Sequence, residues 1–568
     1  MLLSAGIALF SAAHAETWPP GATIESAATA DITPEGFDAI AELIPSMLPS
    51  EIALDDMAEE YEGAWGQCWL GGYAFSVSGM WVGIEVASAD ITPGNGVLDV
   101  RIDLNIWVND SSDPFDLYTE LECIGDTCYG HVAPFPVTVT TTMALDVVEG
   151  TDGPQLDATI GEIVADYPDD LGSYITLDDC AIGTVEEVLN FLGLSLYDLL
   201  IDQLSGTLED QIAEMGPELE TAIEDAFGSA SIDEELDVNG VIINLQLYPS
   251  DVEITPAGVR LQMSGSMSGD AADCVADYDP GGSLKTLTDP PGIGTAPSGI
   301  TTPFHVGLSL SDDIANEAFY ALWRGGLLCY TIGQETFPID TSILNSLSGD
   351  SFEELFPESQ PVTLRTAPEA PPTVFFTGEH DVGIHITDLG LEFFAELDGR
   401  EARMLSVQLD GDAGIDLTFD GTTGDLAVLV ALDPNQLTPS IAYNEIIPSA
   451  NDAILAGFQD TFGSLLDTML GSMLSDLAFA LPSFEGIGLQ DLQLAAAGDQ
   501  SDWLGAYAWI GAVSYTGGSS SCGGCGGDTG GSADTGGSGC SGGCGVLGAP
   551  FAPGFWALAT LVMLRRRR

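Results

Sequence analysis

Few side chains in this sequence have the types and spacing that catalysis or metal binding needs. The five histidines are His14, His131, His305, His380 and His385. His380 and His385 are five residues apart on a predicted strand, so we expect them on opposite faces and without a shared metal. No G-x-S-x-G motif lies between a strand and a helix. We therefore expect no enzymatic activity and no cofactor.

A short acidic run is the best candidate for a cation. Asp410, Asp412 and Asp416 follow one another with glycines between them, but they lack the spacing and the glutamate of an EF-hand. We interpret the run as a strand, a turn and a second strand. Weak binding of Ca²⁺ or other divalent cations is kept as an alternative, and no specific metal site is predicted.

Cysteines point to an oxidising compartment, because ten of them occur in a chain with an export signal. Cys123 and Cys128 flank the residues IGDT, a predicted hairpin tip, and are our candidate disulfide. The pairing of the other four cysteines in the body stays open; these are Cys68, Cys180, Cys274 and Cys329. The Cys-x-x-Cys at 522–525 lacks a folded context for a zinc or redox site.

The charge balance excludes nucleic acid as a partner. The chain has 568 residues, with 88 Asp and Glu against 11 Lys and Arg, and four of the basic residues are the last four positions. Such a field repels phosphates and anionic lipid headgroups. Hydrophobic residues nevertheless make up 45% of the chain, more than a disordered acidic chain would contain. We expect an acidic surface over large apolar cores.

Both ends carry targeting features. Residues 1–15 are apolar and end in Ala-His-Ala, which predicts a signal peptide cleaved after Ala15. Residues 516–545 have the Gly, Ser and Cys composition of a disordered linker. Residues 546–564 form an apolar segment long enough to span a bilayer, and Arg565–Arg568 complete a transmembrane segment at 546–568.

The body consists of two halves with the same order of elements: a helix, antiparallel strands, a long helix and further strands. This order predicts an α+β fold that occurs twice. In the first half, Thr33 and Pro34 begin a helix at 33–48. Residues 98–108 alternate between apolar and polar side chains, which predicts a strand with one buried face. A long helix is expected from Thr184 onward.

The second half begins with GLSLSDDIANEAFYALWRGG at 307–326. Ser309 or Ser311 can cap this helix, and Gly325 and Gly326 end it. Strands follow, and a second long helix is expected at about 440–480. We place the domain boundaries at 31–240 for the first half, 241–303 for central strands and a linker, and 304–513 for the second half.

With this order of elements, residues 31–513 resemble the tubular lipid-binding superfamily, in the branch of bactericidal/permeability-increasing protein, lipopolysaccharide-binding protein and lipid-transfer proteins. The most specific pieces are the 307–328 stretch and the run LPSFEGIGLQDLQLAAAGDQSDWLGAYAWI. The resemblance implies two elongated antiparallel β-barrels, each wrapping a long helix, joined by a central sheet. It also implies an acyl-chain pocket between each sheet and its helix.

Two family features cannot be transferred to this sequence. The cationic tip with which some members bind lipopolysaccharide is absent, since the body has only seven basic residues. The family disulfide joins a strand to the first long helix, but residues 184–228 contain no cysteine.

The C-terminal order of a Cys-containing Gly-rich segment, an apolar helix and an Arg cluster resembles a myxobacterial sorting signal. That resemblance implies anchoring through Cys540 or Cys544 at the outer membrane or cell surface of a Gram-negative bacterium. A plain single-span membrane anchor is the alternative.

We therefore predict non-covalent lipid binding or transfer by an exported, surface-anchored protein, with acyl chains as the ligand. The alternative is a surface structural or adhesive protein whose barrels are filled by side chains. The candidate lipid-binding side chains lie on the apolar faces of the helices: Phe37, Ile40, Ile44, Leu192, Leu196, Leu200, Phe319, Leu322, Trp323, Phe458, Phe462, Leu466, Met469 and Met473.

Overall fold

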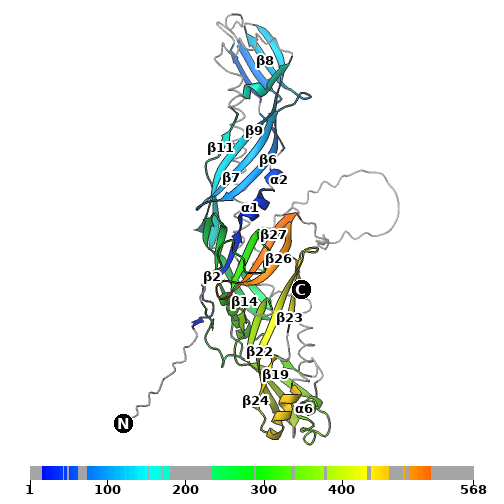
Figure 1. Ribbon diagram of the computed structural model, residues 1–568. Coiled ribbons are helices and arrows are strands. Elements are labelled where there is room, and N and C mark those ends of the chain that lie inside the picture. Colours follow the sequence, from blue (N-terminus) through cyan, green and yellow to red (C-terminus); the bar gives the residue numbers. More distant parts are fainter. Residues whose placement is uncertain are drawn as a thin grey trace, which may run out of the picture.

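The computed structural model is an elongated, mostly β molecule with one sheet at each end and a third between them (Figure 1). The order of these sheets confirms two curled sheets joined by a central one. The structure describes residues 16–512 except 43, 48–49, 55, 62–68, 70–72, 122, 151–152, 169–170, 179–231, 239, 287–288, 334–338, 377–379, 432–435, 459–477 and 481–486.

The central sheet combines strands from both halves of the chain. Its order is β13-β14-β15-β2-β17-β27-β26, with every neighbouring pair antiparallel. It therefore also draws strands from outside 241–303. The bounds are Ile232–Val238 (β13), Val241–Thr255 (β14), Gly258–Gly269 (β15), Ile24–Ile32 (β2), Val306–Ser311 (β17), Trp503–Ala512 (β27) and Ile487–Ala497 (β26).

The first sheet has the order β3-β6-β7-β9-β8-β5-β4, and β10, β11 and β12 also pair with β9. The alternation predicted for 98–108 is confirmed, since Leu98, Val100, Leu104, Ile106 and Val108 are all buried. The bounds are Glu51–Ala53 (β3), Met57–Tyr61 (β4), Tyr73–Ser78 (β5), Trp81–Pro93 (β6), Leu98–Val108 (β7), Phe115–Leu121 (β8), Ile124–Glu149 (β9), Pro154–Ile160 (β10), Val164–Asp166 (β11) and Ile175–Asp178 (β12).

The second sheet has the order β18-β19-β21-β22-β23-β25, with β20 on β21 and β24 on β22. Asp410, Asp412 and Asp416 lie within the single strand β22, so the predicted turn there is wrong. The chain stays extended because the irregularity falls on the partner strand, between Ile386 and Leu389. The bounds are Thr331–Ile332 (β18), Val362–Pro368 (β19), Thr373–Phe375 (β20), Val382–Leu397 (β21), Arg400–Asp420 (β22), Asp425–Ala431 (β23), Thr438–Tyr443 (β24) and Ala478–Ala480 (β25).

Short helices join these sheets. Thr33 caps α1 (Pro34–Ala41) as predicted, and α2 (Ile44–Met47) follows. Ser311 caps α5 (Asp312–Arg324), and Gly325 ends it. The remaining elements are α6 (Thr341–Ser348), the 3₁₀ turns η2 (Leu171–Tyr174) and η4 (Pro448–Ala450), and the short strand pair β1 (Thr17–Trp18) and β16 (Ser283–Leu284).

The structure describes only a small part of the two predicted long helices. The one after Thr184 lies outside the described residues. The one at 440–480 begins later than predicted, because residues 438–443 pair with β22 as strand β24, and helical residues follow at 451–458. The sheets are therefore described, but the wrapping of each around a long helix is not.

The predicted signal peptide, the linker and the segment at 546–568 with Cys540 and Cys544 also lie outside the described residues. In the part of the chain that is described, no helix combines the length and the apolar character needed to cross a membrane.

Candidate functional site

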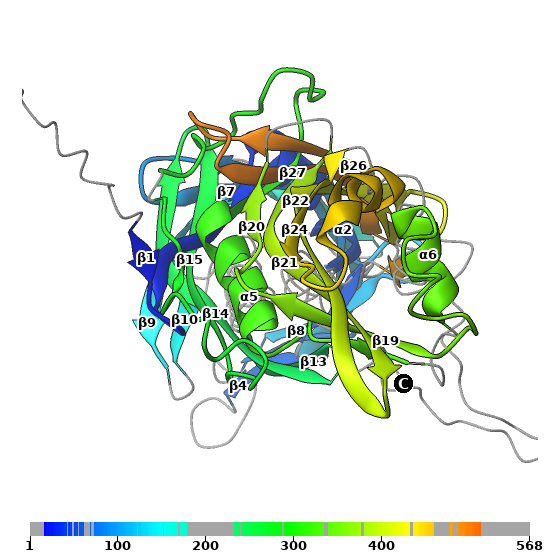
Figure 2. The same ribbon diagram turned by 90° about the horizontal axis from the view of Figure 1, so that it is seen from below.

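Helix α5 lies between the central sheet and strands of the second sheet, as Figure 2 shows along the long axis, and eleven of its thirteen residues are buried. Ile314, Ala318 and Leu322 pack against the central sheet. Phe319 packs, half-buried, with β20 and β22 side chains of the second sheet. Trp323 is 1% exposed, and its indole Nε1 donates to the carbonyl oxygen of Pro368 at 3.0 Å. Predicted lipid-binding residues Leu322 and Trp323 therefore contact protein.

The polar side chains of α5 are buried as well, and most connect it to neighbouring strands. Asn316 Oδ1 accepts the backbone N–H of Val374 at 2.7 Å, which fixes β20. Thr286 donates through its N–H to Asp313 Oδ1 at 2.7 Å and through its hydroxyl to Asp312 Oδ1, also at 2.7 Å. Burial raises the pKa of Asp312 to about 6. These contacts give α5 a structural role.

Glu317 is the least exposed charged side chain of α5, at 0%. Its Oε2 accepts the backbone N–H of Met267 at 3.2 Å. Burial raises the pKa of Glu317 to about 8, although the backbone amides of Met267, Gly21 and Ala22 favour the charged form. Desolvation is the dominant cause, because a carboxylate loses more hydration here than these amides return.

Helix α1 presents only one face to the protein. Phe37 is buried among Leu98, Met143, Ile254 and Val259, side chains of the first and central sheets. Ile40 packs half-buried against the same cluster, and Ile44 of α2 is half-buried as well. The predicted residues of this helix thus close the junction between two sheets.

Phe458 is the one candidate from the second predicted long helix that the structure describes. It is buried in the cluster that α6 forms with the second sheet. The other candidates on the long helices lie outside the described residues: Leu192, Leu196, Leu200, Phe462, Leu466, Met469 and Met473.

The apolar face of the first sheet carries half-buried side chains at the edges of two core clusters. One cluster occupies the far end around Ile106 and Phe135, and another lies around Phe37 at the central sheet. Ile102 of β7 packs at the edge of the first cluster and Ile91 of β6 at the edge of the second, and both are only half-buried. The eleven residues of β7 give this face a length of about 36 Å.

The second sheet repeats this arrangement. One cluster lies around Phe393 and α6, and another lies where β20 and β22 meet the central sheet. Ile384 of β21 packs at the edge of the second of these clusters, Ile386 follows it on the same face, and both are half-buried. Each curled sheet therefore has an apolar stretch of half-buried side chains on the face where an acyl chain was predicted.

The structure pairs two of the four cysteines whose partners the sequence left undetermined: Cys274 and Cys329, at a sequence separation of 55, form a disulfide. Cys123 and Cys128 are each disulfide-bonded, but the predicted bond between them does not fit the register. Cys123 is on the β8–β9 turn, whereas Cys128 lies within β9 opposite Leu117. The extended strand between them spans about 13 Å, beyond the Cα separation of about 7 Å that a disulfide tolerates.

The two histidines of the second sheet lie on the same face, contrary to expectation, because His380 precedes the start of β21. His380 Nδ1 lies 3.0 Å from Asp416 Oδ1, and His385 Nδ1 lies 2.6 Å from Asp412 Oδ1. These aspartates are four residues apart on β22, or about 13 Å. Within the described ranges, no group of three or more His, Cys, Asp or Glu could hold a metal ion.

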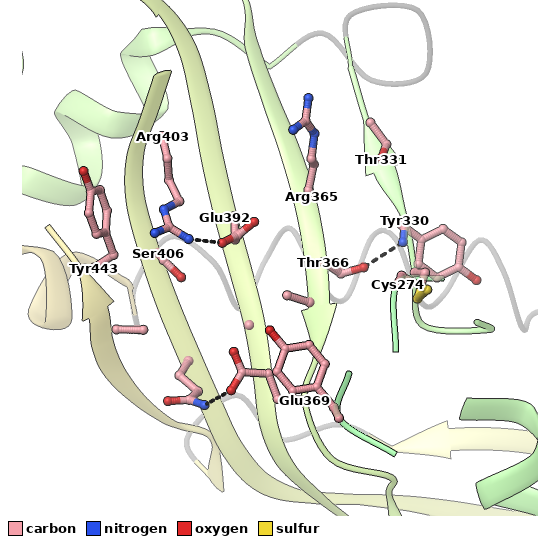
Figure 3. A pocket seen from close by; sticks show the side chains of 16 residues that line it. Cys274, Tyr330, Thr331, Arg365, Thr366, Glu369, Glu392, Arg403, Ser406 and Tyr443 are labelled. Carbon is pink, nitrogen blue, oxygen red and sulfur yellow. Dashed lines mark hydrogen bonds and ion pairs between the residues drawn. A yellow bond between two sulfur atoms is a disulfide. The ribbon is translucent and has the colours of Figure 1, made fainter. Parts of the chain in front are cut away.

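The polar face of the second sheet, opposite its α6 cluster, bears a pocket of about 500 Å³ (Figure 3). Arg365 of β19, Glu392 of β21 and Arg403 of β22 are among its lining residues. No predicted lipid-binding residue lines it. A signal was present in the sequence, since Arg365 and Arg403 are two of only seven basic residues outside the C-terminal cluster.

Comparisons with known proteins give low similarity. No protein family matches the sequence, and neither does any curated protein. The crystal structure of lipopolysaccharide binding protein is similar with a TM-score of 0.49 and 12% identity, covering 87% of this chain and 100% of that one. P47 of Clostridium botulinum E1 has a TM-score of 0.24 and 10% identity, and the match covers 86% of this chain and 99% of that one. P47 from Clostridium botulinum A2 has a TM-score of 0.23 and 9% identity, covering 86% of this chain and 98% of that one. Identities this low carry no information about a ligand.

Proposed function

We propose that this protein binds lipid acyl chains non-covalently on the apolar faces of its two curled sheets, for holding or transfer. The observation that supports this is the apolar stretch of half-buried side chains along one face of each sheet, at Ile91 and Ile102 in the first sheet and at Ile384 and Ile386 in the second. A face of about 36 Å is longer than one acyl chain, which spans about half of a 30 Å hydrocarbon core.

Binding would be driven by desolvation of the acyl chain. Each buried methylene contributes about 0.8 kcal/mol, so a two-chain lipid needs no ion pair with the protein. This suits a chain with a formal charge of −77. Export and anchoring at the cell surface belong to the same proposal, and they are supported by the sequence features at the two ends of the chain.

The second candidate is a structural or adhesive protein with the same fold, in which side chains fill the space beside the sheets. It is favoured by Phe37, Leu322, Trp323 and Phe458, which are all buried among other side chains. In this case the half-buried isoleucines would be covered by protein and the molecule would carry no lipid.

Extraction of the intact protein distinguishes the two. The chain is purified without detergent, extracted with chloroform and methanol, and the extract is analysed by mass spectrometry. The lipid proposal expects stoichiometric lipid in the wild type and at least fivefold less in the double variant Ile102→Trp, Ile386→Trp, whose indoles fill the apolar stretches.

The matched control is Arg101→Trp, His385→Trp. It places the same side chains on neighbouring residues that are exposed on the opposite faces of the same strands. This control should retain its lipid, and circular dichroism checks that both variants fold. A wild-type protein without lipid that also takes up no fluorescent phospholipid would rule the proposal out in favour of the filled fold.

A further inference from the structure

The pocket on the polar face of the second sheet has a floor made by one row of paired residues. Thr331, Arg365, Glu392, Ser406 and Tyr443 are register partners in turn, from β18 through β19, β21 and β22 to β24. All five line the pocket, and Figure 3 shows their side chains along the same face. The floor is therefore as rigid as the sheet itself.

Both arginines that line the pocket lie over aromatic rings. The guanidinium of Arg365 lies 4.2 Å from the ring centre of Phe394, and that of Arg403 lies 4.3 Å from the ring centre of Tyr443. Arg365 donates to Glu401 at 2.7 Å, and Arg403 donates to Glu392. A guanidinium has more N–H donors than one such contact uses, and stacking holds the remaining donors in fixed directions.

One wall of the pocket is formed by the segment around the disulfide Cys274–Cys329. Tyr278 lines this wall and is 44% exposed. The next residue, Asp279, accepts the Tyr320 hydroxyl at 2.6 Å and Arg324 Nε at 3.0 Å. The wall is thus fixed to α5 and covalently closed, and the backbone N–H of Tyr278 donates to the carbonyl of Val275 at 2.9 Å, so the backbone that carries this tyrosine is anchored beside the pocket.

Glycine keeps the centre of the floor open. A Cβ on Gly390 would lie 2.9 Å from the carbonyl oxygen of Ala367 on the neighbouring strand. A side chain here would therefore displace the backbone as well as fill the pocket.

The lining excludes several ligand classes. Its formal charges cancel, because Arg365 and Arg403 are matched by Glu369 and Glu392. An anion would have to approach against the field of a chain with charge −77, and a cation would meet two arginines. An acyl chain would leave the row of polar groups unpaired, which costs free energy.

A neutral polyhydroxylated molecule satisfies this lining. Each hydroxyl both donates and accepts, so it can pair with the guanidinium donors and with the oxygens of Glu369, Glu392 and Gln408. Flat aromatic rings provide apolar surface for the C–H face of a sugar ring. The volume of about 500 Å³ lies within the usual range for small-molecule sites.

We propose that this pocket binds a neutral saccharide, with Arg365 and Arg403 donating to its hydroxyls, Glu392 accepting from them and Tyr278 packing on a sugar ring. The site lies on the opposite face of the sheet from Ile384 and Ile386, so it is independent of lipid binding. The protein would then have two ligand sites, one for acyl chains and one for sugar.

The test is binding of the full-length protein to an array of neutral and acidic oligosaccharides that includes cellohexaose, maltohexaose and chitohexaose, followed by calorimetry with the best neutral glycan. Tyr278→Ala should weaken binding at least tenfold, and Arg365→Gln should do the same. Lipid content should stay unchanged in both variants.

Matched controls come from the first sheet. Tyr129→Ala removes a tyrosine of similar exposure, 42%, and Arg101→Gln removes an exposed arginine that is paired with Asp103. Neither should change saccharide affinity. The proposal is overturned if no glycan binds, if only acidic glycans bind, or if the controls weaken binding as much as the pocket variants do.

Discussion

Helices α1 and α5 open the two halves of the chain, yet they have different surroundings. Each begins at a hydroxyl cap directly after a central strand, Thr33 after β2 and Ser311 within β17. Helix α1 buries Gly36, Phe37 and Ala41 and leaves Glu35 and Asp38 exposed. Helix α5 buries eleven of its thirteen residues, including Asp313 and Glu317.

The difference follows from the number of layers that each helix joins. Helix α1 lies between two sheets, so one face remains in water. Helix α5 contacts the central sheet, strand β20 and the segment around the Cys274–Cys329 disulfide. A repeated order of elements therefore fixes where a helix begins, but tertiary packing decides which of its residues form core.

The stability lost on truncating a buried aromatic residue should differ most between the two helices, with Trp323 of α5 costing more than Phe37 of α1. Trp323→Ala removes a fully buried indole together with its hydrogen bond to the carbonyl of Pro368, so we expect a loss of about 5 kcal/mol. Phe37→Ala should cost about 3 kcal/mol, because Phe37 is buried on a helix whose other face is in water, so its surroundings can relax more than those of Trp323. Urea unfolding of both variants measures this, and equal losses would contradict the layer argument.

The buried carboxyl of α5 should make stability depend on pH. Between the ordinary pKa of 4.5 and about 8, the folded protein keeps a proton on Glu317 that the unfolded chain releases. This contribution to stability is therefore complete below pH 4.5 and is lost as pH rises through 8. A shift of this size, from 4.5 to about 8, corresponds to roughly 5 kcal/mol at pH 9.

Glu317→Gln should remove that dependence, so that the variant gains stability relative to the wild type as pH rises from 5 to 9. Glu35→Gln, on the exposed face of α1, is the matched control and should follow the wild type. Urea midpoints across this pH range provide the measurement. A parallel pH dependence for Glu317→Gln and wild type would show that water reaches the carboxyl.

Local features of the fold were predictable from the sequence. The caps at Thr33 and Ser311 and the alternation over 98–108 depend only on neighbouring residues. Strand β2 was missed because its inward side chains are alanines, Ala27, Ala28 and Ala30, which carry little periodic hydrophobic signal. It nevertheless lies in the middle of the central sheet.

Features that depend on register were not predictable. The pocket floor joins Arg365, Glu392 and Ser406, which are far apart in sequence and meet only when β19, β21 and β22 are aligned. The Cys274–Cys329 bond likewise crosses from the end of β15 to the end of α5. The candidate residues on α5 looked like a lipid-facing stripe because a sequence shows an apolar face but not what covers it.

Removal of the N-cap hydroxyl should lower the unfolding free energy by nearly the same amount in both helices, because their caps make the same two kinds of hydrogen bond. The Thr33 hydroxyl accepts Gly36 N–H at 3.2 Å and donates to the carbonyl of Phe304 at 2.6 Å. The Ser311 hydroxyl accepts Ile314 N–H at 3.4 Å and donates to the carbonyl of Ala27 at 3.0 Å. Thr33→Ala and Ser311→Ala should each cost about 1–2 kcal/mol, measured by urea unfolding. A cost at Ser311 several times that at Thr33 would mean that burial of the whole helix, and not the local cap, sets the energy even at its first turn.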